Sequence, residues 1–337
     1  MTSPLTLLDD ALRAERQSFD RIPVIDVHAL VSGGDTGQAI RDIRWALTNV
    51  GFFYVRNHGI PDALIDNAFA ASRSFFDLPE PDKQALHIAQ SGTALRGYIP
   101  LFGENTDPGK TRDLKECFDL GPEAPGDTRP FFGTNQWPTA LPGLSATLIA
   151  YHDAVAKLSH ALLRGVALSL DLPEAFFADK MRDPISVLRL IHYPPQSGAI
   201  HEDMIGIGAH SDYGNMTVLA QDDVGGLQVL NRDGAWVEAP PIPGTFVINI
   251  GDLVQILTND LYLANLHRVV NTSGRERYSM PFFVEADPDA VFAPLPACVQ
   301  AHPPARYQPV TCGAHMFARY VDSFPHLRDD GPGRATA

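Results

Sequence analysis

The chain has 337 residues, of which 45% are hydrophobic and 20% are charged, so it can bury the core of one large domain or two small ones. Its 40 acidic and 26 basic residues give a formal net charge of -14, and the acids are scattered along the chain. This balance argues against nucleic acid or an anionic membrane as the main partner.

The first half of the sequence predicts helices around short strands. Helical spacing of apolar residues indicates helices over 5–19, 36–49 and 61–76. The aromatic and β-branched run 51–55 predicts a strand that ends at a turn containing His58. Residues 91–142 are rich in Gly, Pro and Asp, which predicts a long irregular stretch of the kind that is often functional. The longest helical pattern follows at 144–170.

After residue 184 the pattern changes to short β-rich runs, at 186–193, 216–221, 227–230, 245–250, 253–257 and 278–285. Many short strands without intervening helices predict an antiparallel sandwich or barrel. A last helix is expected over 313–324. With no internal repeat or linker, we expect a single domain (1–337): an N-terminal helical and strand region (1–184) packs on a mainly β core (185–290), followed by a C-terminal segment and helix (291–337).

Three widely spaced cysteines, Cys117, Cys298 and Cys312, suggest neither a disulfide framework nor a Cys-rich zinc site. Residues 1–20 lack the uninterrupted apolar stretch of an export signal, and no stretch approaches the ~20 apolar residues needed to span a bilayer. These features predict a cytoplasmic protein with reduced thiols. Oligomeric state leaves no signal in the sequence.

A histidine and an aspartate two residues apart, His210 and Asp212, precede the predicted strand 216–221. Residues two apart on a strand share a face, so the two side chains can converge on one ion. His201 and Asp203 repeat the pattern, but they lie in a loop after Gly198. Because a metal site needs rigid support, we favour the later pair. His201 is then a loop histidine near solvent or a residue that covers the site.

His267 is the best candidate for a third ligand, because it lies in an apolar run that can return beside the first strand. Two imidazoles and one carboxylate leave three coordination positions open, an arrangement associated with iron(II) oxygenases. Taken alone, His267 could equally be a buried core histidine whose ring nitrogens have hydrogen-bond partners in the protein.

Arg277 directly precedes the predicted strand 278–285, and by alternation it shares a face with Ser279. A guanidinium and a hydroxyl are therefore expected to point together into the core beside the metal. A buried arginine must be paired, and a carboxylate ligand would pair it in bidentate fashion. The alternative is an edge-strand arginine bridged at the surface, as expected for Arg275. By the same alternation Arg189 and Tyr193 share a face and could contact an anionic cosubstrate, although Tyr193 could equally be a core tyrosine.

These residues resemble the iron(II)/2-oxoglutarate dioxygenases of the isopenicillin N synthase-like family, whose fold is a double-stranded β-helix, a form of jelly roll. The resemblance covers nearly the whole chain and is carried by the segments 22–26, 51–60, 75–79, 209–212, 267–269 and 277–279. It implies that His210, Asp212 and His267 hold iron(II) and that Arg277 and Ser279 hold the distal carboxylate of the cosubstrate 2-oxoglutarate, with dioxygen as the second cosubstrate.

Tyr193 matches the cosubstrate-binding tyrosine of that family. Arg189 matches mainly its bacterial ethylene-forming branch, which the stretch 221–227 also resembles. An asparagine often found two residues before the tyrosine is Ile191 here, so part of the plant-type contact pattern is missing.

The resemblance implies an enzyme that hydroxylates, desaturates or cyclises a small molecule and releases succinate and carbon dioxide. Substrate contacts are expected from 91–119, from the loop 196–205 and from the C-terminal helix. The candidates are Arg96, Tyr98, Lys115 and Phe118, which could instead be surface loop residues or members of local salt bridges.

Three alternatives stay open from the sequence. The first is ethylene-forming cleavage of 2-oxoglutarate itself. The second is a 2-oxoglutarate-independent oxidase of the isopenicillin N synthase type, against which the pairing of Arg189 with Tyr193 argues. The third is a non-catalytic metal or small-molecule binding module, since a fold alone does not establish activity.

Overall fold

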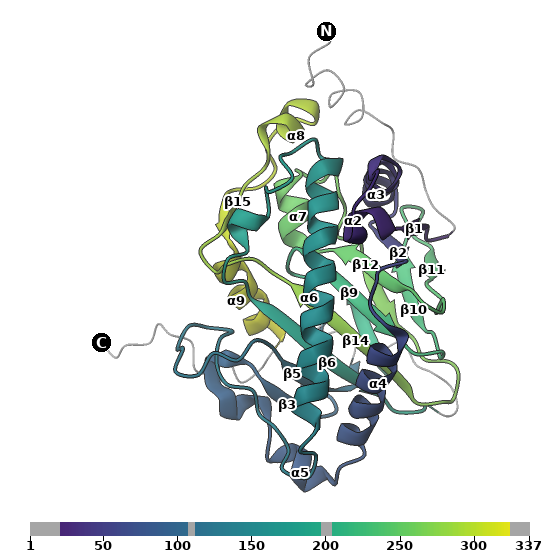
Figure 1. Cartoon of the computed structure of the whole chain (residues 1–337), viewed down its shortest axis with the longest axis vertical. Helices are drawn as coiled ribbons and strands as arrows, with labels where there is room; N and C mark the ends of the chain where they lie inside the picture. The colour runs from purple at the N-terminus through teal and green to yellow at the C-terminus, as the bar shows by residue number, and fades with distance from the viewer. Residues whose placement is uncertain (1–20, 107–111, 197–203, 324–337) are drawn as a thin grey trace.

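The computed structural model describes residues 21–106, 112–196 and 204–323 (Figure 1). The predicted helix 5–19 and His201 lie outside these residues. An eight-stranded sheet forms the centre, in the order β1-β2-β12-β9-β14-β6-β5-β3. A four-stranded sheet, in the order β11-β10-β13-β8, lies against it. The strands within these sheets pair antiparallel except β1 with β2.

The strands of the large sheet are β1 (Val24–Asp26), β2 (Phe52–Arg56), β3 (Gly97–Ile99), β5 (Glu116–Leu120), β6 (Ser186–Tyr193), β9 (Met216–Gln221), β12 (Phe246–Ile250) and β14 (Arg277–Val284). Those of the small sheet are β8 (Ile207–His210), β10 (Leu227–Leu230), β11 (Trp236–Glu238) and β13 (His267–Val269). Two short pairs complete the strands: β4 (Arg112–Asp113) with β7 (Met204–Ile205), and β15 (Val291–Phe292) with β16 (Val310–Thr311).

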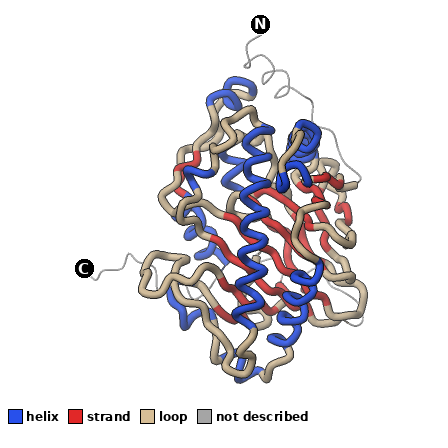
Figure 2. Tube along the Cα trace, viewed as in Figure 1, coloured by secondary structure: helices blue, strands red, loops and turns tan. Residues whose placement is uncertain are grey.

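Helices cover the outer face and the ends of the large sheet (Figure 2). They are α2 (His28–Ser32), α3 (Gly37–Asn49), α4 (Asp62–Phe76), α5 (Glu80–Gln84), α6 (Leu144–Ser169), α7 (Asp252–Leu257), α8 (Pro296–Ala301) and α9 (Cys312–Ser323), with 3-10 turns at Ile88–Ala94 and Ala178–Lys180. The long helix α6 packs on β9 and β14 and contacts α3 and α4 (Figure 1). No helix in the described ranges is long and apolar enough to cross a membrane.

The predicted β core and its main helices are confirmed, because α3, α4, α6 and α9 fall where helical spacing placed them. Two predictions were wrong. Residues 253–257 belong to the helix α7 and not to a strand, because Gly251 is extended and Asp252 begins a helical turn that buries Leu253 and Leu257. The stretch 91–142 is not irregular throughout: β3 and β5 extend the large sheet by pairing next to β6.

Alternation along β14 divides its side chains between two environments. Arg277, Ser279 and Phe283 line an internal cavity between the two sheets. Phe282 points the other way, where its ring lies 5.0 Å from the ring of His152 on α6. The period of two expected for a strand therefore places one row of β14 residues inside the β core.

Candidate metal centre and its two compartments

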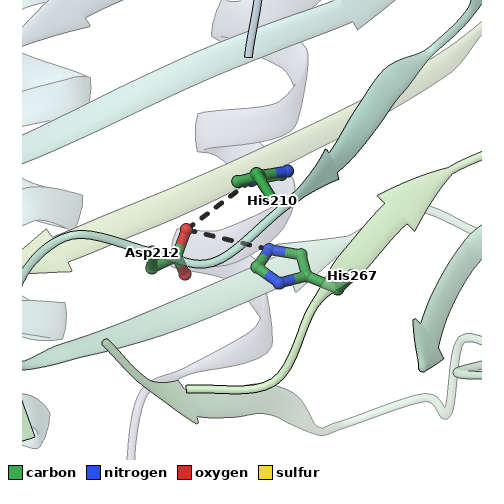
Figure 3. A group of neighbouring side chains, drawn as sticks. All are labelled: His210, Asp212 and His267. Carbon is green, nitrogen blue, oxygen red and sulfur yellow. Dashed lines mark ion pairs between the residues drawn. The ribbon is translucent and has the colours of Figure 1, made fainter. Parts of the chain in front are cut away.

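His210, Asp212 and His267 converge at one end of the cavity (Figure 3). His210 ends β8 and His267 begins β13, and the two histidines are directly paired across these antiparallel strands. Asp212 lies in the turn after β8, with Oδ1 3.7 Å from Nε2 of each histidine. One ligand atom from each residue lies within 4.8 Å of the others, and the described residues hold no other such group.

Hydrogen bonds orient all three side chains. His210 Nδ1 lies 2.9 Å from the carbonyl of Gly208, and His267 Nδ1 lies 3.2 Å from that of Asn265. With Nδ1–H donating to these carbonyls, each Nε2 carries the free lone pair that a metal requires.

The outer oxygen of Asp212 accepts hydrogen bonds from two strand residues. Asn249 Nδ2 on β12 lies 2.6 Å from Oδ2, and Thr217 Oγ1 on β9 lies 2.5 Å from it. These contacts leave Oδ1 directed at the histidines. Sequence reasoning missed both residues, although an asparagine inside the apolar run Phe246–Ile250 was a signal.

The electrostatics favour the protonation states that bind a cation. Burial and the neighbouring His267 lower the pKa of His210 to about 4, which keeps it neutral. Burial alone would raise the pKa of Asp212, but the two histidines and the hydrogen bonds from Asn249 and Thr217 outweigh it and hold the pKa below its usual value. Two neutral imidazole nitrogens and one carboxylate oxygen suit iron(II), so the residues fit the metal that the sequence led us to expect.

At the far side of the cavity lies Arg277, which is 1% exposed. Its Nε donates to the carbonyl of Gly225 at 2.5 Å and its Nη2 donates to Gln221 Oε1 at 3.0 Å, while Nη1 is buried without a hydrogen-bond partner. Ser279 and Tyr193 line the same compartment, and the guanidinium lies 4.6 Å from the centre of the Tyr193 ring. A buried, partly unpaired cation of this kind needs an anion.

Arg189 also lines this cavity, but its charge is already neutralised. Nε and Nη2 donate to Asp119 at 2.7 and 2.8 Å, and Nη1 donates to Glu104 at 2.7 and 3.0 Å. Asp119 lies on β5, which sequence reasoning had left in an irregular stretch. Each of its nitrogens thus donates to a protein carboxylate, and the expected contact of Arg189 with the cosubstrate stays a prediction.

Only one of the four substrate candidates lines the cavity. Lys115 does, with Nζ 3.0 Å from Asp113 Oδ2 and 3.1 Å from Glu104 Oε2. The other three line neither this cavity nor the compartment described next. Phe118 is fully buried, with its ring centre 4.2 Å from that of Phe75, Tyr98 donates to Glu116 at 2.6 Å, and Arg96 donates to the carbonyl of Phe131 at 2.8 Å.

A second compartment meets the first at His210 and Asp212. Tyr213, Glu285, Met316 and Tyr320 line it and do not line the first. Met316 and Tyr320 come from α9, the C-terminal helix from which substrate contacts are expected. Of the expected loop 196–205, most lies outside the described residues.

Comparison with known proteins places this geometry in a family. Residues 22–140 match the model of the non-haem dioxygenase in morphine synthesis N-terminal domain, and residues 184–286 match that of the 2OG-Fe(II) oxygenase superfamily. The 2-oxoglutarate-Fe(II) type oxidoreductase hxnY of Emericella nidulans is 35% identical over 316 residues, 90% of each chain. Homoarginine-6-hydroxylase 2-ODD-233 of Oryza sativa subsp. japonica is 37% identical over 326 residues, 91% of this chain and 98% of that one.

Among solved structures, a full-length Neurospora crassa protein in complex with alpha-KG and thymine superposes with a TM-score of 0.80 at 27% identity, over 89% of this chain and 96% of that one. The likeness extends over the jelly-roll core and the flanking helices, as the sequence predicted. The chain thus belongs to the iron(II)- and 2-oxoglutarate-dependent oxygenases of the isopenicillin N synthase-like superfamily.

Proposed function

We propose that His210, Asp212 and His267 hold the iron and that Arg277, with Ser279 and Tyr193, holds the distal carboxylate of 2-oxoglutarate. The observation that carries the proposal is the Nη1 of Arg277, which is buried without a partner in a cavity that also contains the three candidate ligands. An anion with a carboxylate at each end would connect the two sites.

The reaction we propose is hydroxylation of a carbon on a small molecule. When bound, iron(II) and 2-oxoglutarate supply the activation of dioxygen, with one oxygen atom entering succinate as carbon dioxide leaves and the other entering the substrate. Relatives named homoarginine-6-hydroxylases and a structural neighbour solved with thymine support a small-molecule substrate. Hydroxylation is favoured over desaturation or cyclisation because these relatives are hydroxylases.

The protein's own residues position the two reactants and limit access of water. Ile191, Leu219 and Val269 give the cosubstrate compartment apolar walls between its charged ends. Ile191 and Val269 are buried and Leu219 is partly buried, so these walls lower the local dielectric, which strengthens the contact between a carboxylate and Arg277. Because Arg189 is paired with two carboxylates of the protein, its presence does not favour an ethylene-forming reaction. For the same reason it does not argue against a 2-oxoglutarate-independent oxidase.

The test is Arg277→Ala, with Arg275→Ala as the matched control because Arg275 is an exposed arginine that pairs with Asp223. Hydrogen bonds to a charged group contribute about 1.5–3 kcal/mol each, so losing two should weaken 2-oxoglutarate binding about 10²- to 10⁴-fold. Binding is measured anaerobically from the visible absorption that 2-oxoglutarate induces with iron(II), and turnover from succinate. Unchanged affinity and unchanged succinate in Arg277→Ala would refute the cosubstrate assignment.

A further inference from the structure

We propose that Glu285 binds the primary substrate and that the group it receives is a cationic nitrogen, such as a guanidinium, an amidinium or an ammonium. This inference rests on the proposed function, because it assigns the second compartment to the substrate that is oxidised.

Glu285 follows β14 directly and lines the second compartment together with His210 and Asp212. It is 2% exposed. Among the described residues its carboxylate accepts one hydrogen bond, from the backbone N–H of Asn215, 3.2 Å from Oε2. No lysine or arginine of the described ranges lies within ion-pair distance of it. A carboxylate so deeply buried is costly unless a cation or several donors reach it.

Every other carboxylate in the walls of the two compartments has such a partner. Glu104 is bound by Arg189 and Lys115, and Asp212 is placed to bind the metal. Glu285 alone faces the compartment with a single neutral donor. We infer that the missing partner arrives with the substrate.

The surrounding charges leave room for one more cation. The buried network behind the compartments contains three carboxylates, those of Glu104, Asp113 and Asp119, and three cations, because Arg96 acts on Asp119 in addition to the ion pairs of Arg189 and Lys115, so no positive charge is left over for Glu285. In the filled site, iron(II) and Arg277 would balance Asp212 and a doubly charged 2-oxoglutarate. The filled site thus carries no spare positive charge for Glu285.

The local backbone is built to admit this carboxylate. A Cβ on Gly214 would lie 1.3 Å from Glu285 Oε2, so any larger residue there would force the side chain out of its position. The aromatic rings of Phe283, Tyr213 and Tyr320 and the thioether of Met316 form the apolar part of the walls, and Glu104, Thr106 and Arg189 line the compartment as well. Flat aromatic walls beside a carboxylate that has no cationic partner suit a planar cation such as guanidinium, which can stack on a ring while it donates to the acid.

The experiment measures binding by calorimetry, under anaerobic conditions, to the full chain loaded with iron(II) and 2-oxoglutarate, and again to the metal-free chain. The cationic probes are L-arginine, L-homoarginine, L-lysine and benzamidine, and L-citrulline is the neutral isostere of arginine. We expect at least one cationic probe to bind, and citrulline to bind at least 10-fold more weakly than arginine if arginine is that probe.

Glu285→Gln should weaken the binding of the cationic probe 10- to 100-fold, and Glu285→Asp should retain part of it because the charge remains. Glu238→Gln removes an exposed acid on β11 and should change nothing. The 2-oxoglutarate-induced absorption, recorded in the same samples, should be unchanged in all three variants.

The outcomes separate the two proposals. Wild-type protein without that absorption would contradict the proposed function. If the absorption is present, any of three results would overturn the role of Glu285. These are equal binding of charged and neutral probes, no binding of any cationic probe at millimolar concentration, and undiminished binding of the cationic probe to Glu285→Gln.

Discussion

Replacing Glu285 by glutamine should stabilise the substrate-free protein, although the residue is proposed to serve function. Burial raises the pKa of Glu285 from 4.5 to about 8, and the negative charge of Asp212 adds to the shift. A binding residue held ready for a cation carries an electrostatic penalty while that cation is absent. The penalty should be measurable as a dependence of stability on pH.

The sign follows from the direction of the shift. The folded-state pKa of this acid lies above the unfolded value, so unfolding releases a proton between pH 4.5 and 8 and stability falls as pH rises through that window. Above pH 8 the loss is complete and constant. At pH 7 the difference from 4.5 is 2.5 pH units, which at 1.36 kcal/mol per unit corresponds to about 3 kcal/mol. Glutamine does not ionise and should not show this loss.

The assay is urea unfolding of metal-free wild type and Glu285→Gln at pH 5, 6, 7, 8 and 9, followed by circular dichroism. The difference in the free energy of unfolding should grow by roughly 1.4 kcal/mol per pH unit and level off near pH 8. Glu238→Gln, which removes an exposed acid, should show no such trend. A difference between wild type and Glu285→Gln that does not vary with pH would show that Glu285 is ionised at an ordinary pKa, and the reasoning would fail.

Three further predictions concern neighbouring groups. Glu104→Gln should lower the free energy of unfolding at pH 7 by about 3–5 kcal/mol, measured in urea, because it removes the acid that the buried Arg189 and Lys115 share. Burial opposes ionisation of Glu104, but these two cations hold its pKa at about 2. Wild type should therefore lose this stability only as pH falls from 4.5 towards 2. Gly214→Ala should weaken the cationic probe at least 10-fold in calorimetry, since its Cβ would displace Glu285. Thr217→Val should weaken iron(II) binding 10- to 100-fold in a metal titration, because it removes a hydrogen bond to Asp212. Unchanged stability in Glu104→Gln, unchanged probe affinity in Gly214→Ala or unchanged iron affinity in Thr217→Val would contradict the corresponding prediction.

The candidate metal centre could be predicted from the sequence because most of its geometry is local. Two residues on the β8 strand and the turn after it, His210 and Asp212, needed only alternation to be placed together. His267 needed one long-range assumption, a strand returning beside the first, and the register of β13 with β8 supplies it. Most of the strands and helices followed from the same periodicities, whereas the jelly-roll core was implied by the resemblance to the family.

Sequence reasoning was incomplete where the decisive partner came from a distant segment. Arg189 was placed correctly on the inner face of β6, but the acids that occupy it come from β5 and from the loop that holds Glu104. The strand β5 has no alternation to reveal it, because all five of its residues are buried. The five-residue run 253–257, which is apolar except for Gln255, contains too little periodicity to distinguish the helix α7 from a strand.

Glu285 could have been found by the argument that found Arg277. The two residues are eight positions apart, an even number, so they share a face of an extended chain. The backbone N–H of Glu285 donates to the carbonyl of Ile185, which continues the pairing of β14 with β6 by one residue. One strand therefore carries an unpaired cation at its start and an unpaired acid just past its end, about 26 Å apart along the backbone at ~3.3 Å per residue. Two of the candidate metal ligands, His210 and Asp212, border both compartments, so under the two proposals this row of side chains would place the anionic cosubstrate and the cationic substrate on either side of the metal.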